Sequence, residues 1–200
     1  MEYIISAIIG YLFGCINTAS IVSRKKGIDI KKVGSNNAGA SNVFISVGKM
    51  YGVFVAVIDV FKSLIAASLV YYLFEENLSL AILAGAMVIV GHNFPFWMKF
   101  NGGKGLAPFM GLILFYNCKV FIAFGIILIA ITLITDYIAI GSLTLCTLMP
   151  AFVWFNGEGN IIIPVFVVLA VIMWFKHRDN LKRLLTGTEI GFLRKNKVKK

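Results

Sequence analysis

The stretch LAPFMGLILFYNCKVFIAFGIILIAITLIT, Leu106 to Thr135, decides how this chain is folded. Its second part, Lys119–Thr135, is an apolar run almost as long as the roughly 20 residues that are needed to cross a bilayer core. Its first part, Leu106–Tyr116, is equally apolar but only 11 residues long. Whether this short part crosses the membrane determines the side on which every later segment lies.

Five further segments are apolar over lengths that approach or reach a membrane span. The chain of 200 residues is 59% apolar and has a mean hydropathy of +0.88, whereas soluble domains are about half apolar. We therefore expect an all-α, polytopic membrane protein with about seven transmembrane helices, in a single integral membrane domain over residues 1–200. The other expected helices are Tyr3–Ser23, Gly52–Leu73, Leu78–Trp97, Tyr137–Phe155 and Ile161–Phe175.

The basic residues predict the topology. Seventeen of the nineteen Lys and Arg residues fall in residues 24–49, 99–104 and 176–200, and short cytoplasmic loops carry such an excess of positive charge. The segment before Arg24 contains Glu2 and no Lys or Arg. We therefore expect the N-terminus outside and the C-terminus in the cytoplasm, with seven crossings, because six would place the basic tail outside.

Three further expectations follow from this topology. Residues 190–200 should form a flexible basic tail. The protein should lie in the inner (cytoplasmic) membrane, with its active site facing the cytoplasm. The net charge of +10 is explained by the positive-inside bias, so no nucleic-acid partner is expected.

The first basic stretch contains a polar loop, Gly34-Ser35-Asn36-Asn37-Ala38-Gly39-Ala40-Ser41-Asn42. Small residues let backbone N–H groups approach an anion closely, and the Ser and Asn side chains add donors and acceptors. The same residue types are also common in turns and helix caps, so a plain linker is the alternative interpretation.

The second basic stretch contains the loop Asn101-Gly102-Gly103-Lys104-Gly105. Three glycines around one Lys have the chemistry of a phosphate cradle, with accessible amides and a point charge. The loop is not a Walker A motif, because Gly105 follows the Lys where a Ser or Thr is required. The alternative is a flexible turn whose Lys serves only the topology.

The third stretch begins His177-Arg178-Asp179-Asn180, after the last apolar segment. Its basic residues suit either an anion site or contacts with lipid headgroups. Within the apolar segments, Asp59, Lys62 and His92 are ionisable, and such residues are either paired or functional. The sequence shows no carboxylate pair for acid–base catalysis and no metal-binding cluster, so a reaction here would depend on anion binding and positioning.

Taken together, these segments resemble the bacterial acyl-phosphate:glycerol-3-phosphate acyltransferase family, PlsY. The resemblance rests on three motifs in register and extends over essentially the whole chain. They are the Gly34–Asn42 loop through Gly48, then Gly91-His92-Asn93-Phe94-Pro95 followed by Lys99-Phe100-Asn101-Gly102-Gly103-Lys104-Gly105, and His177-Arg178-Asp179-Asn180 with Arg183, Leu184, Gly187 and Glu189.

The resemblance implies a seven-helix fold that transfers a fatty acyl group from acyl phosphate to the sn-1 hydroxyl of glycerol 3-phosphate, without metal or cofactor. The products are lysophosphatidic acid and phosphate, and a partner enzyme would make the acyl phosphate. Substrate and phosphate would be held by Ser35, Asn37, Gly39, Asn42, Gly102, Gly103 and Lys104. The catalytic polar site would be completed by Ser142, His177 and Asn180.

The sequence departs from this family at several positions of the expected site. Ile45 stands where the family has an Arg, Pro108 where it has a hydroxyl residue, and Phe109 and Ala139 where it has small polar residues. A guanidinium can form paired hydrogen bonds with phosphate, whereas Ile cannot. A cation such as Lys49 or Arg24 would therefore have to replace the missing Arg.

Three hypotheses therefore stay open at this point. The first is an acyltransferase of this type. The second is a non-catalytic or substrate-shifted paralogue that binds phosphate-bearing lipid precursors, suggested by Ile45 and Pro108. The third is a small membrane transporter that uses the intramembrane residues Asp59, Lys62 and His92.

Overall fold

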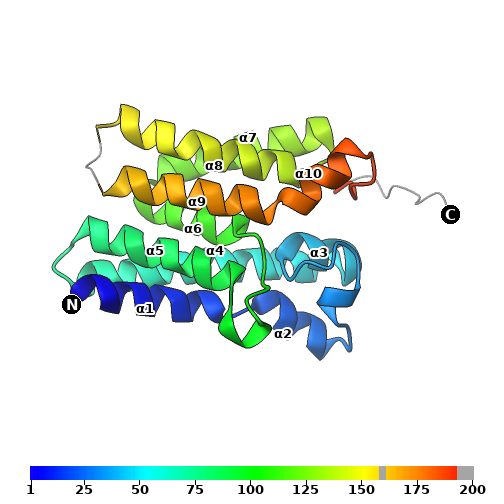
Figure 1. Ribbon diagram of the computed structural model, residues 1–200, viewed down its shortest axis with the longest axis horizontal. Helices are drawn as coiled ribbons and strands as arrows, with labels where there is room; N and C mark the ends of the chain where they lie inside the picture. Colours follow the sequence, from blue (N-terminus) through cyan, green and yellow to red (C-terminus); the bar gives the residue numbers. More distant parts are fainter. Residues whose placement is uncertain (158–160, 193–200) are drawn as a thin grey trace.

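The computed structural model describes residues 1–157 and 161–192, and every regular element in these ranges is a helix. The long apolar helices lie side by side along the long axis (Figure 1). The elements are α1 (Glu2–Cys15), α2 (Thr18–Lys25), η1 (Ile30–Lys32), α3 (Ala40–Ser46), α4 (Lys49–Leu73), α5 (Leu78–Asn93), η2 (Phe96–Met98), α6 (Leu106–Tyr116), α7 (Cys118–Thr135), α8 (Ile138–Phe155), α9 (Ile162–Lys176) and α10 (Arg178–Leu185).

Five stretches of the described chain are long and apolar enough to cross a membrane, and α6 and α9 are shorter apolar helices. The all-helical fold is therefore confirmed, whereas the count of seven crossings stays a prediction. The bounds of the short helix agree with the expected Leu106–Tyr116. Pro108 is tolerated there because it lies in the first turn, where its missing N–H would have no helical partner.

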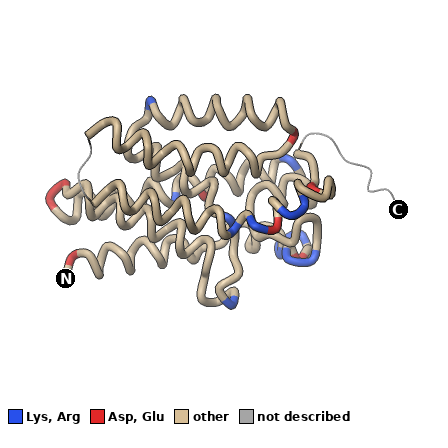
Figure 2. The backbone as a smooth tube through the Cα atoms, turned by 45° about the horizontal axis from the view of Figure 1, so that its top comes forward, with Lys and Arg blue, Asp and Glu red and all other residues tan. Residues whose placement is uncertain are grey.

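The charges separate along the long axis. The N-terminus and the turn after α4 lie at one end, while most Lys and Arg residues gather at the other end (Figure 2). That second end also holds α2, α3, α10 and the loop before α6 (Figure 1). The two loops that the sequence singled out and the start of α10 thus meet at one end of the bundle.

The first expected helix, Tyr3–Ser23, is interrupted. Asn17 leaves the helical conformation (φ −93°, ψ 93°) and caps α2, its side chain accepting a hydrogen bond from the Ser20 N–H at 2.8 Å. The same side chain donates to the Ala38 carbonyl at 3.1 Å. An Asn in the N-cap position is more stable than one in the middle of an apolar helix, so the break ties α2 to the Gly34–Asn42 loop.

Close backbone contacts fix the position of α5. A Cβ atom at Gly10 would collide with the Ala84 carbonyl, and one at Gly91 with the Tyr11 carbonyl. Glycines therefore let α1 and α5 pack backbone to backbone. Because His92 follows Gly91 directly, this contact also places the end of α5 and the loop that leads to Lys104.

Candidate active site

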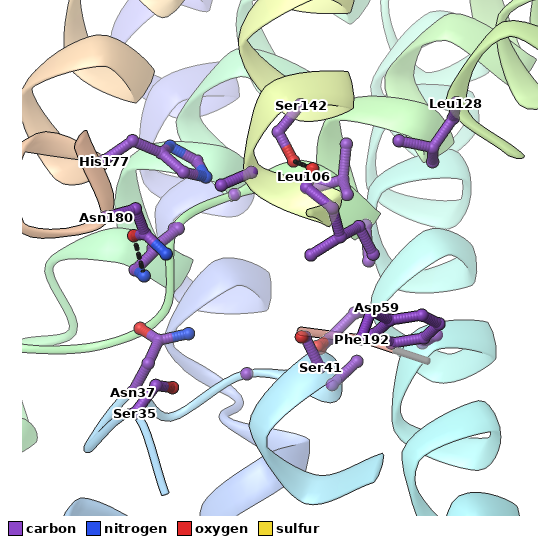
Figure 3. Close-up of a pocket in the computed structure, with 18 of the residues that line it drawn as sticks. Ser35, Asn37, Ser41, Asp59, Leu106, Leu128, Ser142, His177, Asn180 and Phe192 are labelled. Atoms are coloured by element: carbon purple, nitrogen blue, oxygen red, sulfur yellow. Dashed lines mark hydrogen bonds between the residues drawn. The ribbon is translucent and has the colours of Figure 1, made fainter. Parts of the chain in front are cut away.

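A cavity of about 320 Å³ opens between the basic end and the interior of the bundle. His177, Asn180, Asn37 and Ser35 gather at one side of it (Figure 3). Leu106 and Leu128 lie at the other side (Figure 3). The lining also includes the apolar side chains of Val60, Met110, Phe121 and Ile138. The cavity therefore has a polar end and an apolar end.

The structure brings together seven of the ten predicted site residues in the lining of this cavity: Ser35, Asn37, Gly39, Lys104, Ser142, His177 and Asn180. They come from the three motifs and, through Ser142, from one further segment of the chain. The described lining does not include Asn42, Gly102 or Gly103, whose roles in binding stay predictions.

Asn42 stabilises the Gly34–Asn42 loop from outside the described lining of the cavity. Its side-chain amide donates to the carbonyls of Ile30, Val33 and Asn37 at 3.0–3.1 Å. Its oxygen accepts from the Ser35 N–H at 3.0 Å. With both ends of the amide engaged inside the protein, Asn42 fixes the positions of Ser35 and Asn37 rather than reaching into the cavity.

Gly102 and Gly103 close the end of α5. Their N–H groups donate to the carbonyls of Asn93 and His92, both at 3.0 Å. Both amides are therefore engaged within the protein, and their expected part in a phosphate cradle stays a prediction. A Cβ at Gly103 would collide with the His92 ring, so the glycines let the loop turn tightly against α5 and direct Lys104 into the cavity.

Lys104 heads a chain of polar contacts that runs away from the cavity. Its Nζ donates to Asn180 Oδ1, and Asn180 Nδ2 donates to Glu189 Oε1 at 2.5 Å. Glu189 Oε2 accepts from Arg183 Nε at 2.6 Å. Arg183 and Glu189 form an ion pair, and in its described hydrogen bonds Lys104 reaches that pair only through the neutral amide of Asn180.

The surroundings of Lys104 weaken its hold on its proton. Burial, together with the charge of Arg183, lowers the pKa of Lys104 from 10.5 to about 8. At neutral pH the side chain is still a cation, and a half-buried cation favours the entry of an anion. Among the described lining residues it is the only Lys or Arg.

His177 lies at the same polar end, between α9 and α10. Its Nδ1 lies 2.8 Å from the Met173 carbonyl, which can only accept, so Nδ1 carries the proton and Nε2 is the acceptor nitrogen. Burial, aided by the charges of Lys104 and Lys176, lowers the pKa of His177 to about 4. His177 is therefore neutral at pH 7 and suited to accept a hydrogen bond from a hydroxyl group.

Ser142 reaches the cavity from α8, while its hydroxyl group donates to the Ile138 carbonyl at 2.9 Å. The neighbouring Ala139 also lines the wall. The hydroxyl oxygen can still accept a hydrogen bond from a ligand. Ser142 lies where the polar end of the cavity passes into the apolar end (Figure 3).

The three ionisable residues within the helices form one closed cluster. Lys62 Nζ lies 2.9 Å from Asp59 Oδ1 and 3.0 Å from His92 Nδ1. It also donates to the carbonyls of Gly14 and Ile16, where α1 ends. The cluster fastens the break between α1 and α2 to α4 and α5, which accounts for these residues without an ion pathway.

The departures from the family pattern have different positions in the structure. Ile45 lines the cavity and is 36% exposed, so the missing guanidinium leaves an apolar wall. Pro108 and Phe109 are buried, outside the described lining. Lys49 and Arg24, the expected substitutes, are exposed and also lie outside that lining.

Sequence reasoning assigned no site role to Glu189 and none to residues 190–192, which it placed in a flexible tail. The structure puts Glu189, Ile190 and Phe192 in the lining. Its place in the third motif was the available signal for Glu189. The rest of the expected tail, residues 193–200, lies outside the described residues.

Metal binding was not expected from the sequence. Within residues 1–157 and 161–192, no group of three or more His, Cys, Asp or Glu side chains is placed to hold a metal ion.

Known proteins match this arrangement. The family model described as glycerol-3-phosphate acyltransferase matches residues 4–187. The chain belongs to the glycerol-3-phosphate acyltransferase family. It is 37% identical to glycerol-3-phosphate acyltransferase 1 of Oceanobacillus iheyensis, over 94% of each chain. It is 36% identical to the glycerol-3-phosphate acyltransferase of Thermosipho melanesiensis, over 94% of this chain and 92% of the relative.

A solved structure shares the fold of this family member. The crystal structure of PlsY (YgiH), an integral membrane glycerol 3-phosphate acyltransferase in its glycerol 3-phosphate form, superposes with a TM-score of 0.89. The two chains are 29% identical, and 96% of each is covered. The lysophosphatidic acid form of the same protein gives a TM-score of 0.86. The chain is accordingly a multi-pass membrane protein of the acyltransferase type.

Proposed function

We propose that this protein transfers a fatty acyl group from acyl phosphate to the sn-1 hydroxyl of glycerol 3-phosphate, and releases lysophosphatidic acid and phosphate. One observation carries the proposal: Lys104, the one Lys or Arg in the described lining, stands at the polar end of a cavity whose other end is apolar. A phosphate fits the first end and an acyl chain fits the second. The related PlsY has been solved with glycerol 3-phosphate and with lysophosphatidic acid.

The reaction forms a bond between the glycerol oxygen and the acyl carbon, and it breaks the bond between that carbon and the phosphate oxygen. Lys104 would hold phosphate oxygens, supported by Asn180. Neutral His177 would orient the hydroxyl group through Nε2, with Ser35 and Asn37 on the same side of the cavity (Figure 3). The hydroxyl proton leaves with the released phosphate, so the protein contributes mainly positioning and electrostatic stabilisation.

The proposed topology places the basic end, and therefore the mouth of the polar end, in the cytoplasm. The asymmetric charge along the bundle supports it (Figure 2), because basic loops are retained on the cytoplasmic side. The N-terminus would lie outside the inner membrane. An enzyme that makes acyl phosphate would then supply the donor from the cytoplasm or the membrane surface.

The proposal is tested with the purified protein in detergent or vesicles. Lauroyl phosphate and glycerol 3-phosphate should yield lysophosphatidate and phosphate in equal amounts, and lauroyl-CoA should not replace the donor. Product formation from lauroyl-CoA alone would assign a different donor. Saturable binding of glycerol 3-phosphate without turnover would instead support the non-catalytic paralogue that Ile45 suggests.

A further inference from the structure

We propose that residues 188–192, here called the C-terminal strap, shield bound acyl phosphate from water and so make glycerol 3-phosphate the preferred acceptor. The stack of Phe192 on Phe44 is the contact that keeps this shield closed. The inference rests on the proposed acyltransferase function, and it assigns acceptor specificity to residues outside the polar end of the cavity.

The strap begins at a turn that reverses the chain after α10. Gly187 has a left-handed conformation (φ +65°), and its N–H donates to the Leu184 carbonyl at 3.2 Å. The next N–H, of Thr188, donates to the Arg183 carbonyl at 2.8 Å. This pair of hydrogen bonds is a Schellman motif, which ends a helix and redirects the chain. The turn itself is exposed, but Glu189 and Gly191 beyond it are buried.

The strap then crosses to two other elements. Glu189 bonds to Asn180 and Arg183 on α10. The Phe192 N–H donates to the carbonyl of Asp136, between α7 and α8, at 2.8 Å. The strap therefore bridges α10 and the α7–α8 turn.

The aromatic contact joins the strap to α3. The rings of Phe192 and Phe44 stack with centroids 4.8 Å apart and an interplanar angle of 21°. Phe44 is a firm anchor, because a Cβ at Gly52 would collide with its backbone, so that α3 lies tightly against α4. Phe192 is thus held by its stack on Phe44 and by one described backbone hydrogen bond, to the Asp136 carbonyl.

The strap faces the cavity with apolar groups. Ile190 and Phe192 line it together with Glu189, whose carboxylate is already engaged. Phe192 lies near Ser41 and Asp59, across from Leu106 (Figure 3). An apolar wall at this place excludes water from the junction of the polar and apolar ends, where the acyl carbon of a bound donor would lie.

Water exclusion matters for this chemistry because acyl phosphate is a mixed anhydride. Water can attack the acyl carbon, form a carbon–oxygen bond and displace phosphate, giving a free fatty acid and a released proton. Closed sites suppress such side reactions. Opening the strap should therefore increase hydrolysis relative to transfer, even where glycerol 3-phosphate still binds to Lys104.

The test measures free fatty acid and lysophosphatidate formed from lauroyl phosphate in the same reaction. Phe192→Ala and Phe44→Ala should each raise the ratio of hydrolysis to transfer roughly 2- to 12-fold, the factor that corresponds to losing one aromatic pair. Phe192→Tyr retains the ring and should keep the wild-type ratio. Phe155→Ala, which removes an exposed ring at the end of α8, is the matched control and should leave the ratio unchanged.

Two outcomes separate this inference from the function on which it rests. If wild-type protein makes lysophosphatidate and the Phe192 and Phe44 variants lower hydrolysis and transfer in parallel, the strap does not select the acceptor. If Phe155→Ala raises the ratio as much as they do, the shielding role is also refuted. If wild-type protein makes no lysophosphatidate, the proposed function itself fails.

Discussion

Two charged clusters contribute residues to the lining of the cavity, and they differ in one respect. In the first, Lys62 is surrounded by Asp59, His92 and two backbone carbonyls. In the second, Arg183 and Glu189 balance one another, and Lys104 at the end of the chain contacts only a neutral amide among its described hydrogen bonds. The first cluster is closed, and the second ends in a charge that faces open space.

The difference separates structural from functional charge. A buried ion pair with all its hydrogen bonds made holds elements together but offers nothing to a ligand. A partly buried cation whose described hydrogen bond goes to a neutral amide, and which faces a cavity, indicates a place where an anion binds. Substitutions in the first cluster should therefore affect folding, and substitutions in the second should affect turnover.

The largest effect is expected for Lys62→Met. It leaves the buried carboxylate of Asp59 without its partner, which typically costs about 3–5 kcal/mol. We expect a clearly lower Tm in detergent and poor yield of folded protein. Adding Asp59→Asn removes the orphaned charge and should recover part of the loss. An unchanged Tm for Lys62→Met alone would contradict the structural role of this cluster.

Lys104→Ala should have the opposite signature. It removes a charge-assisted contact to phosphate worth about 1.5–3 kcal/mol, so kcat/KM for glycerol 3-phosphate should fall on the order of 10- to 100-fold. Its Tm should stay near that of wild-type protein. Lys99→Ala, five residues earlier on an exposed position, is the matched control. Equal loss of activity in both variants would indicate a general effect of charge at the basic end.

Ile45→Arg would add a second cation to the wall of the cavity, beside Lys104. Ile45 lines the cavity, so a guanidinium there can reach a bound phosphate. We expect kcat/KM for glycerol 3-phosphate to rise about tenfold, which corresponds to roughly 1.4 kcal/mol. Ile45→Gln offers hydrogen bonds without charge and should give a smaller gain. A loss of activity in Ile45→Arg would show that the phosphate site does not need a further cation at this position.

The smallest effect concerns pH. Since burial lowers the pKa of Lys104 to about 8, its charge is present below that pH and is lost as the pH rises through it. The kcat/KM of the free enzyme should therefore fall about fourfold by roughly pH 8.5. Lys104→Arg keeps its charge far above this range. A decline of the same size in the Arg variant would assign the titration to another group.

The sequence predicted the helices well because long apolar runs leave few alternatives. It also predicted the gathering of Ser35, Lys104 and His177, since the basic loops had to share one side of the membrane. It missed the break at Asn17, because the apolar run around that residue masks the capping signal. The break depends on a tertiary hydrogen bond from Asn17 to the Ala38 carbonyl, which the local sequence does not reveal.

Other features depend on tertiary contacts that no local pattern specifies. The glycines at 102 and 103 suit a phosphate cradle, but their amides bond to the end of α5. Asn42 belongs to a motif whose residues resemble substrate ligands. In its described hydrogen bonds, however, it contacts only groups of the protein itself. The Phe44–Phe192 stack joins residues far apart in the chain, and neither ring has a sequence context that predicts the other.

The central claim is that Lys104 supplies the free cation that holds the phosphate of glycerol 3-phosphate. Calorimetric titration of glycerol 3-phosphate into purified wild-type protein, Lys104→Ala and Lys99→Ala tests it most directly. We predict saturable binding to the wild type and to Lys99→Ala, and affinity lowered at least tenfold, or no detectable binding, in Lys104→Ala. Binding to Lys104→Ala with wild-type affinity would contradict the account.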